Sequence, residues 1–190
     1  MLDKVLLQIA KSAILKKFDE NYTFDEKKLL KQYPYLNKDG AVFVTLKQNK
    51  ELRGCIGSII AHKTLLDDLT HNALSASFSD PRFQALQKEE LSSLNLEVSL
   101  LSEPKILDYE NYEDLLQKVR PNIDGLILEH TRFRGTFLPQ VWEQLNTPKL
   151  FLEHLSMKAG ATPSIYSEHP NIYVYQVEHI EADFDEILCL

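Results

Sequence analysis

Apolar residues recur with helical spacing near the start of the chain and again in several later segments. Between residues 2 and 19 they fall three or four positions apart, which predicts an amphipathic helix. Thr23 and Thr64 are the expected N-caps of the next two helices, and Gly160 is the expected stop of the last one. These further helices are predicted over residues 24–32, 64–78, 111–119, 139–145 and 148–159.

Elsewhere the apolar period changes to two, which is typical of strands. The predicted strands cover residues 41–46, 52–60, 94–101, 125–130, 133–138 and 172–177. Short turns separate the first two and also the fourth and fifth, which predicts two hairpins. Because helices and hairpins interleave without repeated βαβ units, we expect an α+β fold. It would be a mainly antiparallel sheet built from hairpins with flanking helices, in two intimate subdomains.

Both predicted hairpins carry an Arg-Gly pair on the returning strand. The first pair is Arg53-Gly54 and the second is Arg134-Gly135. Either chance similarity between two hairpins or an internal duplication would explain why the Arg-Gly pair occurs twice.

Length and charge narrow the classes of protein that the chain can represent. With 190 residues it fits one compact unit or two close subdomains. Lys and Arg number 21 against 28 Asp and Glu, a net charge of −7, so the chain would repel a phosphate backbone. No run of basic residues exceeds two, and no apolar run reaches the roughly 20 residues of a membrane span. We therefore expect neither a nucleic-acid-binding protein nor a membrane protein.

Cysteine and histidine usage predicts neither a disulfide framework nor a metal site. The two cysteines, Cys55 and Cys189, do not have zinc-site spacing. Histidine follows glutamate four times, but adjacent side chains diverge and cannot share one metal ion. The first residues lack the apolar core of a signal peptide, so we expect a cytoplasmic protein. No dinucleotide or phosphate-loop fingerprint identifies a cofactor, which stays unknown.

The most unusual segment of the chain is residues 52–58. Its two glycines, Gly54 and Gly57, each cost a strand about 1 kcal/mol, so something should compensate for them. Strand alternation places Arg53, Cys55 and Gly57 on one face and Gly54 on the other. A guanidinium beside a thiol favours the thiolate, which indicates a nucleophile, or else an anion site in which the thiol is incidental. Alternatively, Cys55 is a small buried residue and the glycines let a helix pack closely.

Four charged residues outside this segment are further candidates. Arg134 shares a strand face with Arg132, and Asp80 and Arg82 flank the proline of an expected turn at a helix end. Glu97 lies in the alternating strand over residues 94–101 and could move protons. Solvated or paired surface charges are the structural alternative for all four.

Taken together, these stretches resemble the AMMECR-one domain family. The resemblance covers about residues 40–180, with helices over residues 1–39 as its weaker part, so the whole chain, 1–190, is expected to be one such domain. The matching stretches are residues 42–47, 52–57, 76–83, 96–99, 124–128, 134–142 and 158–160.

The resemblance implies a fold of two subdomains around antiparallel sheet and a cytosolic setting. No established reaction comes with the family. Its signature is Arg-Gly-Cys-Ile-Gly, which this chain carries at residues 53–57, and the resemblance implies that these residues form a functional site. In microbes, members resemble companions of a Memo-type protein and a radical-SAM protein, which are therefore expected partners.

Two functions follow as hypotheses. In the first, the protein is a Cys-dependent enzyme, or the active component of one, that acts on a small anionic substrate. In the second, it is a non-catalytic scaffold whose two Arg-Gly hairpins shape a surface for another protein. The first assigns catalysis to Cys55 and Arg53, access to Gly54 and Gly57, anion binding to Arg134 and Arg82, and proton transfer to Asp80 or Glu97.

Overall fold

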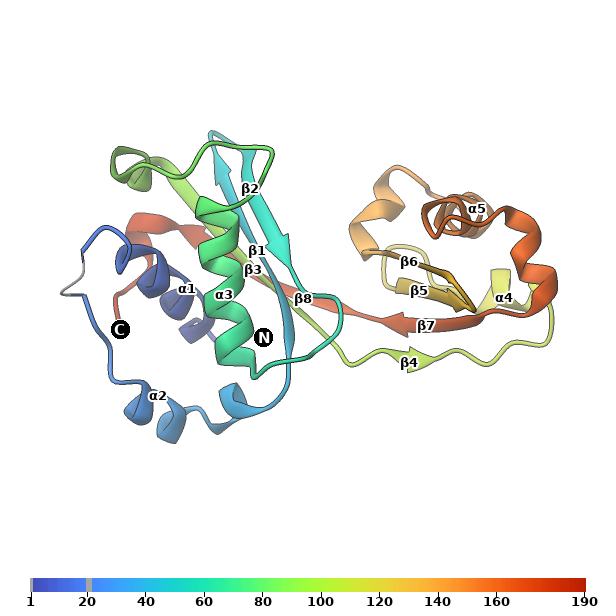
Figure 1. The fold of residues 1–190 in the computed structure, drawn as a ribbon, viewed down its shortest axis with the longest axis horizontal. Helices are drawn as coiled ribbons and strands as arrows, with labels where there is room; N and C mark the ends of the chain where they lie inside the picture. Colours follow the sequence, from blue (N-terminus) through green and yellow to red (C-terminus); the bar gives the residue numbers. More distant parts are fainter. Residues whose placement is uncertain (1, 20–21) are drawn as a thin grey trace. The chain divides into compact units, whose positions relative to one another are not determined.

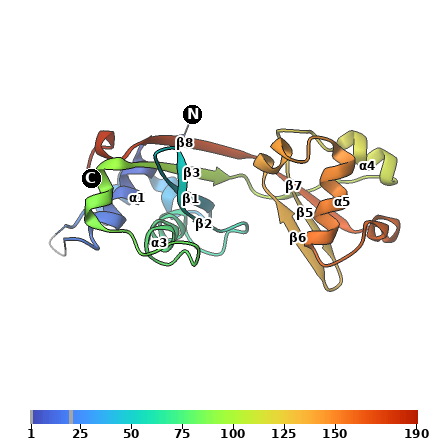
Figure 2. The same ribbon diagram turned by 90° about the horizontal axis from the view of Figure 1, so that it is seen from above.

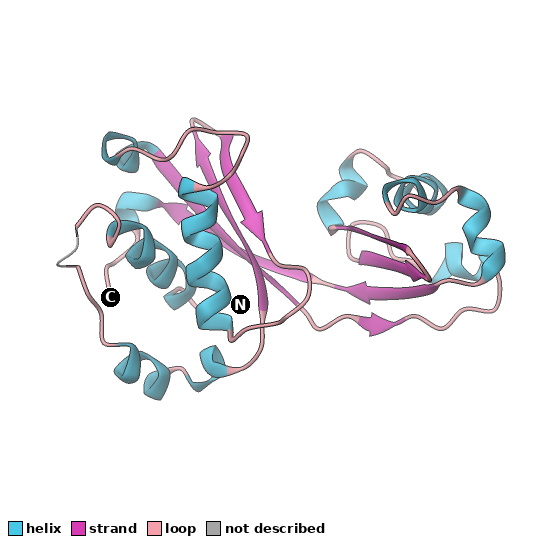
Figure 3. Ribbon diagram, viewed as in Figure 1, coloured by secondary structure: helices cyan, strands magenta, loops and turns pink. Residues whose placement is uncertain are grey.

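The chain divides into two compact units, each with its own sheet and its own hydrophobic core. The computed structural model describes residues 2–19 and 22–190. Unit 1 comprises Met1–Leu101 and Glu178–Leu190, and unit 2 comprises Ser102–Val177. The helices and antiparallel strand pairs confirm the predicted α+β class (Figure 3).

In unit 1, helices α1 and α3 cover one face of a four-stranded sheet (Figures 1 and 2). The strand order is β2-β1-β3-β8. Val42, Val44 and Leu46 of β1 are fully buried against these helices, and the residues that alternate with them, Phe43, Thr45 and Lys47, are half-buried. The elements are α1 (Val5–Leu15), α2 (Glu26–Gln32), β1 (Ala41–Gln48), β2 (Glu51–Gly57), α3 (Leu65–Phe78), β3 (Leu94–Leu101) and β8 (Val177–Asp183).

Unit 2 has a second four-stranded sheet, with the order β4-β7-β5-β6, and helix α5 packs on β6 (Figure 1). In its core the Trp142 and Phe151 rings stack with centroids 3.8 Å apart. The elements are β4 (Lys105–Ile106), α4 (Tyr112–Lys118), β5 (Gly125–His130), β6 (Phe133–Phe137), α5 (Pro148–Lys158) and β7 (Asn171–Tyr175).

The two units share one sequence of elements. In each, a hairpin is followed by a helix and then by a third strand that pairs with the first strand of the hairpin. Gly54 lies opposite Leu46 in the first hairpin, and Gly135 lies opposite Leu128 in the second. The two glycines therefore occupy equivalent positions, although Arg53 has no partner in β1 and Arg134 lies opposite Glu129. The shared order of elements favours internal duplication over chance similarity.

Several local predictions are confirmed. Thr64 caps α3 by accepting a hydrogen bond from the Asp67 amide, and Gly160 follows α5 with a left-handed φ of 84°. The β1–β2 turn has positive φ at both Asn49 and Lys50, as a two-residue hairpin turn requires. Among the described residues, no helix has the length and apolar character of a membrane span.

Other local predictions are corrected by the structure. The cap of α2 is Asp25, whose carboxylate accepts from the Lys28 amide, and not Thr23, because the first helical residue is Glu26. The predicted helix over 139–145 is a short 3-10 helix, Pro139–Glu143. Strand β2 ends at Gly57 rather than at residue 60, since the Ser58 hydroxyl donates to Asp68 on α3 at 2.6 Å.

Two strands, β4 and β8, were not expected from the sequence. β4 has only two residues, both exposed, and β8 carries Glu178, Glu181 and Asp183, so its apolar alternation is weak. Only Val177, the first residue of β8, falls within the strand predicted over residues 172–177. These strands lie at the edges of their sheets, where polar residues are tolerated.

Candidate functional site

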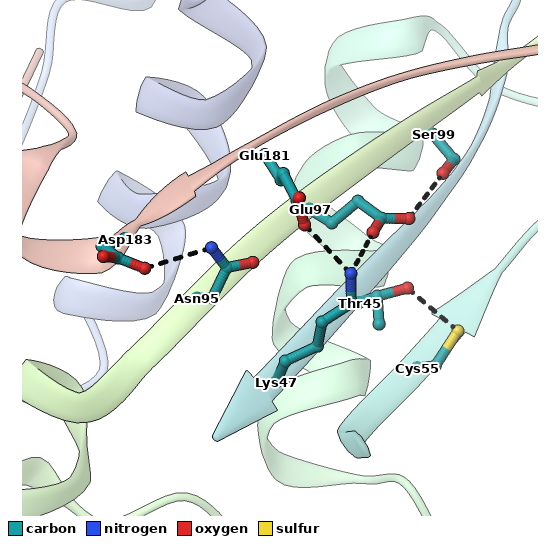
Figure 4. A network of polar contacts seen from close by, with 8 residues as sticks. All are labelled: Thr45, Lys47, Cys55, Asn95, Glu97, Ser99, Glu181 and Asp183. Atoms are coloured by element: carbon teal, nitrogen blue, oxygen red, sulfur yellow. Dashed lines mark hydrogen bonds and ion pairs between the residues drawn. The ribbon is translucent and has the colours of Figure 1, made fainter. Parts of the chain in front are cut away.

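Cys55 lies in β2, at the edge of the unit 1 sheet. Its side chain is on the face of that sheet opposite helices α1 and α3, which we call the outer face (Figure 4). It is half-buried and lies opposite Thr45 of β1. The Thr45 hydroxyl donates a hydrogen bond to the Cys55 sulfur, with 3.3 Å between Oγ1 and Sγ. The thiol is therefore held in one position by the strand beside it.

A β-bulge at Arg53 sets this pairing. Lys47 lies opposite Leu52 and Leu46 lies opposite Gly54, so Arg53 has no partner in β1. The bulge interrupts the strict alternation that would place the Arg53 side chain next to the thiol. It also shifts the register by one residue, which brings Cys55 opposite Thr45.

The Asp80-Pro81-Arg82 turn fixes the backbone of Cys55 from the open edge of β2. The Asp80 Oδ2 atom accepts from the Cys55 amide at 2.9 Å, and Arg82 Nη2 donates to the Cys55 carbonyl oxygen at 3.1 Å. Asp80 and Arg82 also pair with each other at 2.7 Å. Hydrogen bonds from Arg82 and from the Cys55 amide hold the pKa of the Asp80 carboxyl well below its usual range. The guanidinium beside Cys55 is thus that of Arg82, and it contacts the main chain.

The Arg53 guanidinium forms a two-pronged ion pair with Glu90, at 2.8 Å from Nε and 3.1 Å from Nη2. It also lies over the Phe83 ring, 5.9 Å from the centroid, and its Nη1 atom is buried without a hydrogen-bond partner. The ion pair lowers the pKa of Glu90. Arg53 thus connects the bulge to the segment after α3.

Beyond Thr45, polar side chains continue across the outer face (Figure 4). The Lys47 ammonium donates to Glu97 at 2.6 Å and to Glu181 at 3.0 Å. Glu97 lies opposite Thr45 in the β1–β3 pair and also accepts from the Ser99 hydroxyl at 3.2 Å. The hydrogen bond to Glu97 raises the pKa of Lys47. Lys47 therefore lies on the strand next to Cys55, and Glu97, the candidate for proton transfer, lies on β3, two strands from the thiol.

A cavity of about 560 Å³ opens at the Lys47 end of this polar row. Lys50, Asn95, Glu181 and Asp183 also line it. It is large enough for a small polar molecule. Among the described residues, no group of three His, Cys, Asp or Glu side chains could hold a metal ion.

Both glycines of the signature have a packing role. A Cβ atom at Gly54 would lie 2.2 Å from the carbonyl oxygen of Ala76, so the strand could not approach α3 as closely. A Cβ atom at Gly57 would lie 2.2 Å from the Phe43 ring, on the other face. Close packing against a helix is confirmed for Gly54, whereas Gly57 makes room for the Phe43 ring of β1 on the outer face.

The structure brings seven of the eight predicted site residues into unit 1, where Asp80 and Arg82 directly contact Cys55. Arg134 belongs to unit 2, where it is exposed on β6. The sequence analysis missed Thr45, Lys47 and Glu90. The alternation of β1 already put Thr45 and Lys47 on one face, but it could not show which residue of β2 lies opposite them.

Comparisons with known proteins agree with this architecture. The sequence model of the AMMECR1 family matches residues 7–180. A protein of Methanocaldococcus jannaschii is 35% identical over 171 residues, covering 85% of this chain and 83% of that protein. A protein of Methanothermobacter thermautotrophicus is 39% identical over 144 residues, covering 75% of each. The crystal structure of an uncharacterized protein from Pyrococcus horikoshii covers 95% of this chain and 91% of its own, with a TM-score of 0.78 and 29% identity. The resemblance predicted from the motifs is confirmed: the chain belongs to the AMMECR1 family.

Proposed function

We propose that this protein is the active component of a cytoplasmic enzyme system in which Cys55 reacts with a small, anionic, electrophilic substrate. One observation carries the proposal. Gly54, Gly57, Asp80 and Arg82 each have a packing or pairing role, whereas the Cys55 side chain is half-exposed and touches a hydroxyl donor. Packing and pairing therefore explain why the residues around Cys55 are glycine, aspartate and arginine, but they do not explain why residue 55 is a cysteine.

The chemistry that fits this arrangement is addition of the thiol to a carbonyl carbon. A bond forms between Cys55 Sγ and that carbon while the carbonyl π bond opens, and the thiol proton ends on the former carbonyl oxygen, so no group leaves. Thr45, which donates to the sulfur, stabilises the developing thiolate. Arg82, whose side chain is exposed beside Cys55, is the proposed anion-binding group, and Arg53 and Asp80 are positioning residues.

The partners are part of the same proposal. The family resemblance supports a Memo-type protein and a radical-SAM protein as companions, and a reducing cytoplasm would keep Cys55 as a thiol.

Alkylation kinetics test the reactivity of Cys55. We expect iodoacetamide to modify Cys55 faster than Cys189, although Cys189 is the more exposed thiol, as followed by peptide mass spectrometry. Thr45→Val, which removes the donor and keeps the shape, should slow Cys55 several-fold and leave Cys189 unchanged. A Cys55 that reacts no faster than Cys189 in the native protein would remove this proposal.

The second candidate is a non-catalytic scaffold, and the pairing of Arg53 with Glu90 favours it, because that guanidinium is already occupied. In a scaffold, binding to a Memo-type or radical-SAM partner should survive Cys55→Ser and fail in Arg53→Glu or Arg134→Glu, as measured by pull-down. Binding that persists in both arginine variants would reject the scaffold.

A further inference from the structure

Unit 1 contains a second hollow, on the helical side of its sheet. This cavity of about 880 Å³ lies between the end of α1, the segment before α2 and one side of α3, and we call it the α1–α3 groove. The Cys55 side chain lies on the outer face of the sheet, so the groove is distinct from the candidate site. Its volume falls in the usual range of small-molecule sites.

The floor of the groove is apolar. Leu66, Thr70 and Leu74 are four residues apart on α3 and therefore share one side of the helix, where Ala13 of α1 and Phe24 complete the floor. Leu66 and Ala13 are buried, but Leu74 and Phe24 are only half-buried. Half-covered apolar side chains in a hollow favour a ligand that has an apolar part.

Among the described residues that line the groove, the rim carries one more cation than anion. Lys16, Lys17 and Lys63 are exposed there, against the carboxylates of Glu26 and Asp67. The Asp67 carboxylate accepts a hydrogen bond from the Thr64 hydroxyl at 2.7 Å. A cationic rim on a chain with a net charge of −7 selects for a ligand with a negative head.

We propose that the α1–α3 groove binds an amphipathic anion, a molecule with an aliphatic tail and a single carboxylate head. The tail lies on the half-buried Phe24 and Leu74 side chains, and the lysines of the rim hold the head. This site is independent of Cys55, so its test does not depend on the outcome of the test of the proposed function.

Titration of the full chain with dodecanoate below its micelle concentration tests the site, followed by amide chemical shifts in two-dimensional NMR. We expect saturable one-to-one binding, with shifts confined to the end of α1, the residues around Phe24 and the Leu66–Leu74 side of α3. Dodecyltrimethylammonium has the same tail with a cationic head, and acetate has the head without the tail. Both should bind at least about tenfold more weakly.

The double variant Lys17→Glu/Lys63→Glu sharpens the test. Both lysines are exposed, so the fold should persist, and reversing the two charges should weaken dodecanoate binding by about tenfold. Lys88→Glu, which reverses a single charge at an exposed position outside the groove, should leave the affinity unchanged.

Four results would overturn the proposal: no saturable binding, shifts centred on another surface, equal binding of the cationic amphiphile, or a Lys88→Glu effect as large as that of the double variant. A fifth is a native protein that sediments as a dimer and becomes monomeric in the double variant, because the groove would then belong to a second copy of the chain.

Discussion

In both Arg-Gly hairpins the glycine packs in the same way. The residue after the glycine has different surroundings in the two units. In unit 1, Gly54 lies against the Ala76 carbonyl, near the end of α3. In unit 2, Gly135 lies against the backbone nitrogen of Ala159, just after α5. Each glycine thus lets a strand approach the end of the helix that follows its hairpin, and this requirement is common to both units.

The next residue is Cys55 in unit 1 and Thr136 in unit 2. The Thr136 hydroxyl lies 3.1 Å from that of Tyr175, which in turn donates to the Phe137 carbonyl at 3.0 Å. This hydroxyl belongs to a closed chain of hydrogen bonds with a structural role. The Cys55 sulfur accepts one bond, from Thr45, and is half-exposed. Both units thus have a glycine that packs against a helix end. Of the two residues that follow these glycines, only Cys55 of unit 1 is a candidate for chemistry.

The largest expected effect comes from substitutions that disrupt the close glycine packing common to both hairpins. Gly54→Ala puts a methyl group 2.2 Å from a carbonyl oxygen and should lower the free energy of unfolding by about 3 kcal/mol. Gly135→Ala, with its nearest atom at 2.9 Å, should cost about 1 kcal/mol. Urea unfolding measures both. Equal costs would contradict the geometry of close approach.

An intermediate effect concerns one buried aspartate from each unit, Asp80 in unit 1 and Asp124 in unit 2. Arg82 holds the pKa of Asp80 low, and at Asp124 the hydrogen bonds from Arg120 and Gln176 outweigh burial, so that its pKa is also lowered. Since the unfolded chain then binds more protons, both carboxylates stabilise the protein above about pH 4, and this contribution is lost as the pH falls.

Asp80→Asn tests this contribution, because the amide group would face donors that now meet a carboxylate. We expect a loss of about 2 kcal/mol at pH 7 and a flatter decline of stability between about pH 5 and 2. Asp124→Asn is the matched control in unit 2. Asp80→Asn should also change the alkylation rate of Cys55, and Asp124→Asn should not. An unchanged acid decline in Asp80→Asn would refute the role of its carboxylate.

The smallest expected effect compares the two arginines. Arg53→Met leaves Glu90 without its partner and should cost about 1 kcal/mol, whereas Arg134→Met, at an exposed position, should change stability by less than about 0.5 kcal/mol. Thermal unfolding at pH 7 distinguishes them. A larger loss in Arg134→Met would show that β6 depends on that side chain.

Much of the secondary structure could be predicted from the sequence. The strand over residues 94–101 and the helix that starts after Thr64 have the predicted limits, because apolar periodicity and an N-cap are local signals. The short, polar edge strand β8 was missed since its pairing with β3 depends on residues about 80 positions away.

The sequence by itself determined the elements, the class of fold, the family and the segment that contains Cys55. The tertiary structure decided what surrounds the thiol. A two-residue turn at Asn49 and Lys50 alone would place Cys55 opposite Val44, and the bulge at Arg53 moves it opposite Thr45. Asp80 accepts a hydrogen bond from the Cys55 amide, and Arg82 donates one to the Cys55 carbonyl, because the turn after α3 reaches the edge of β2. Periodicity describes a single segment, whereas register and edge contacts depend on how separate segments pack.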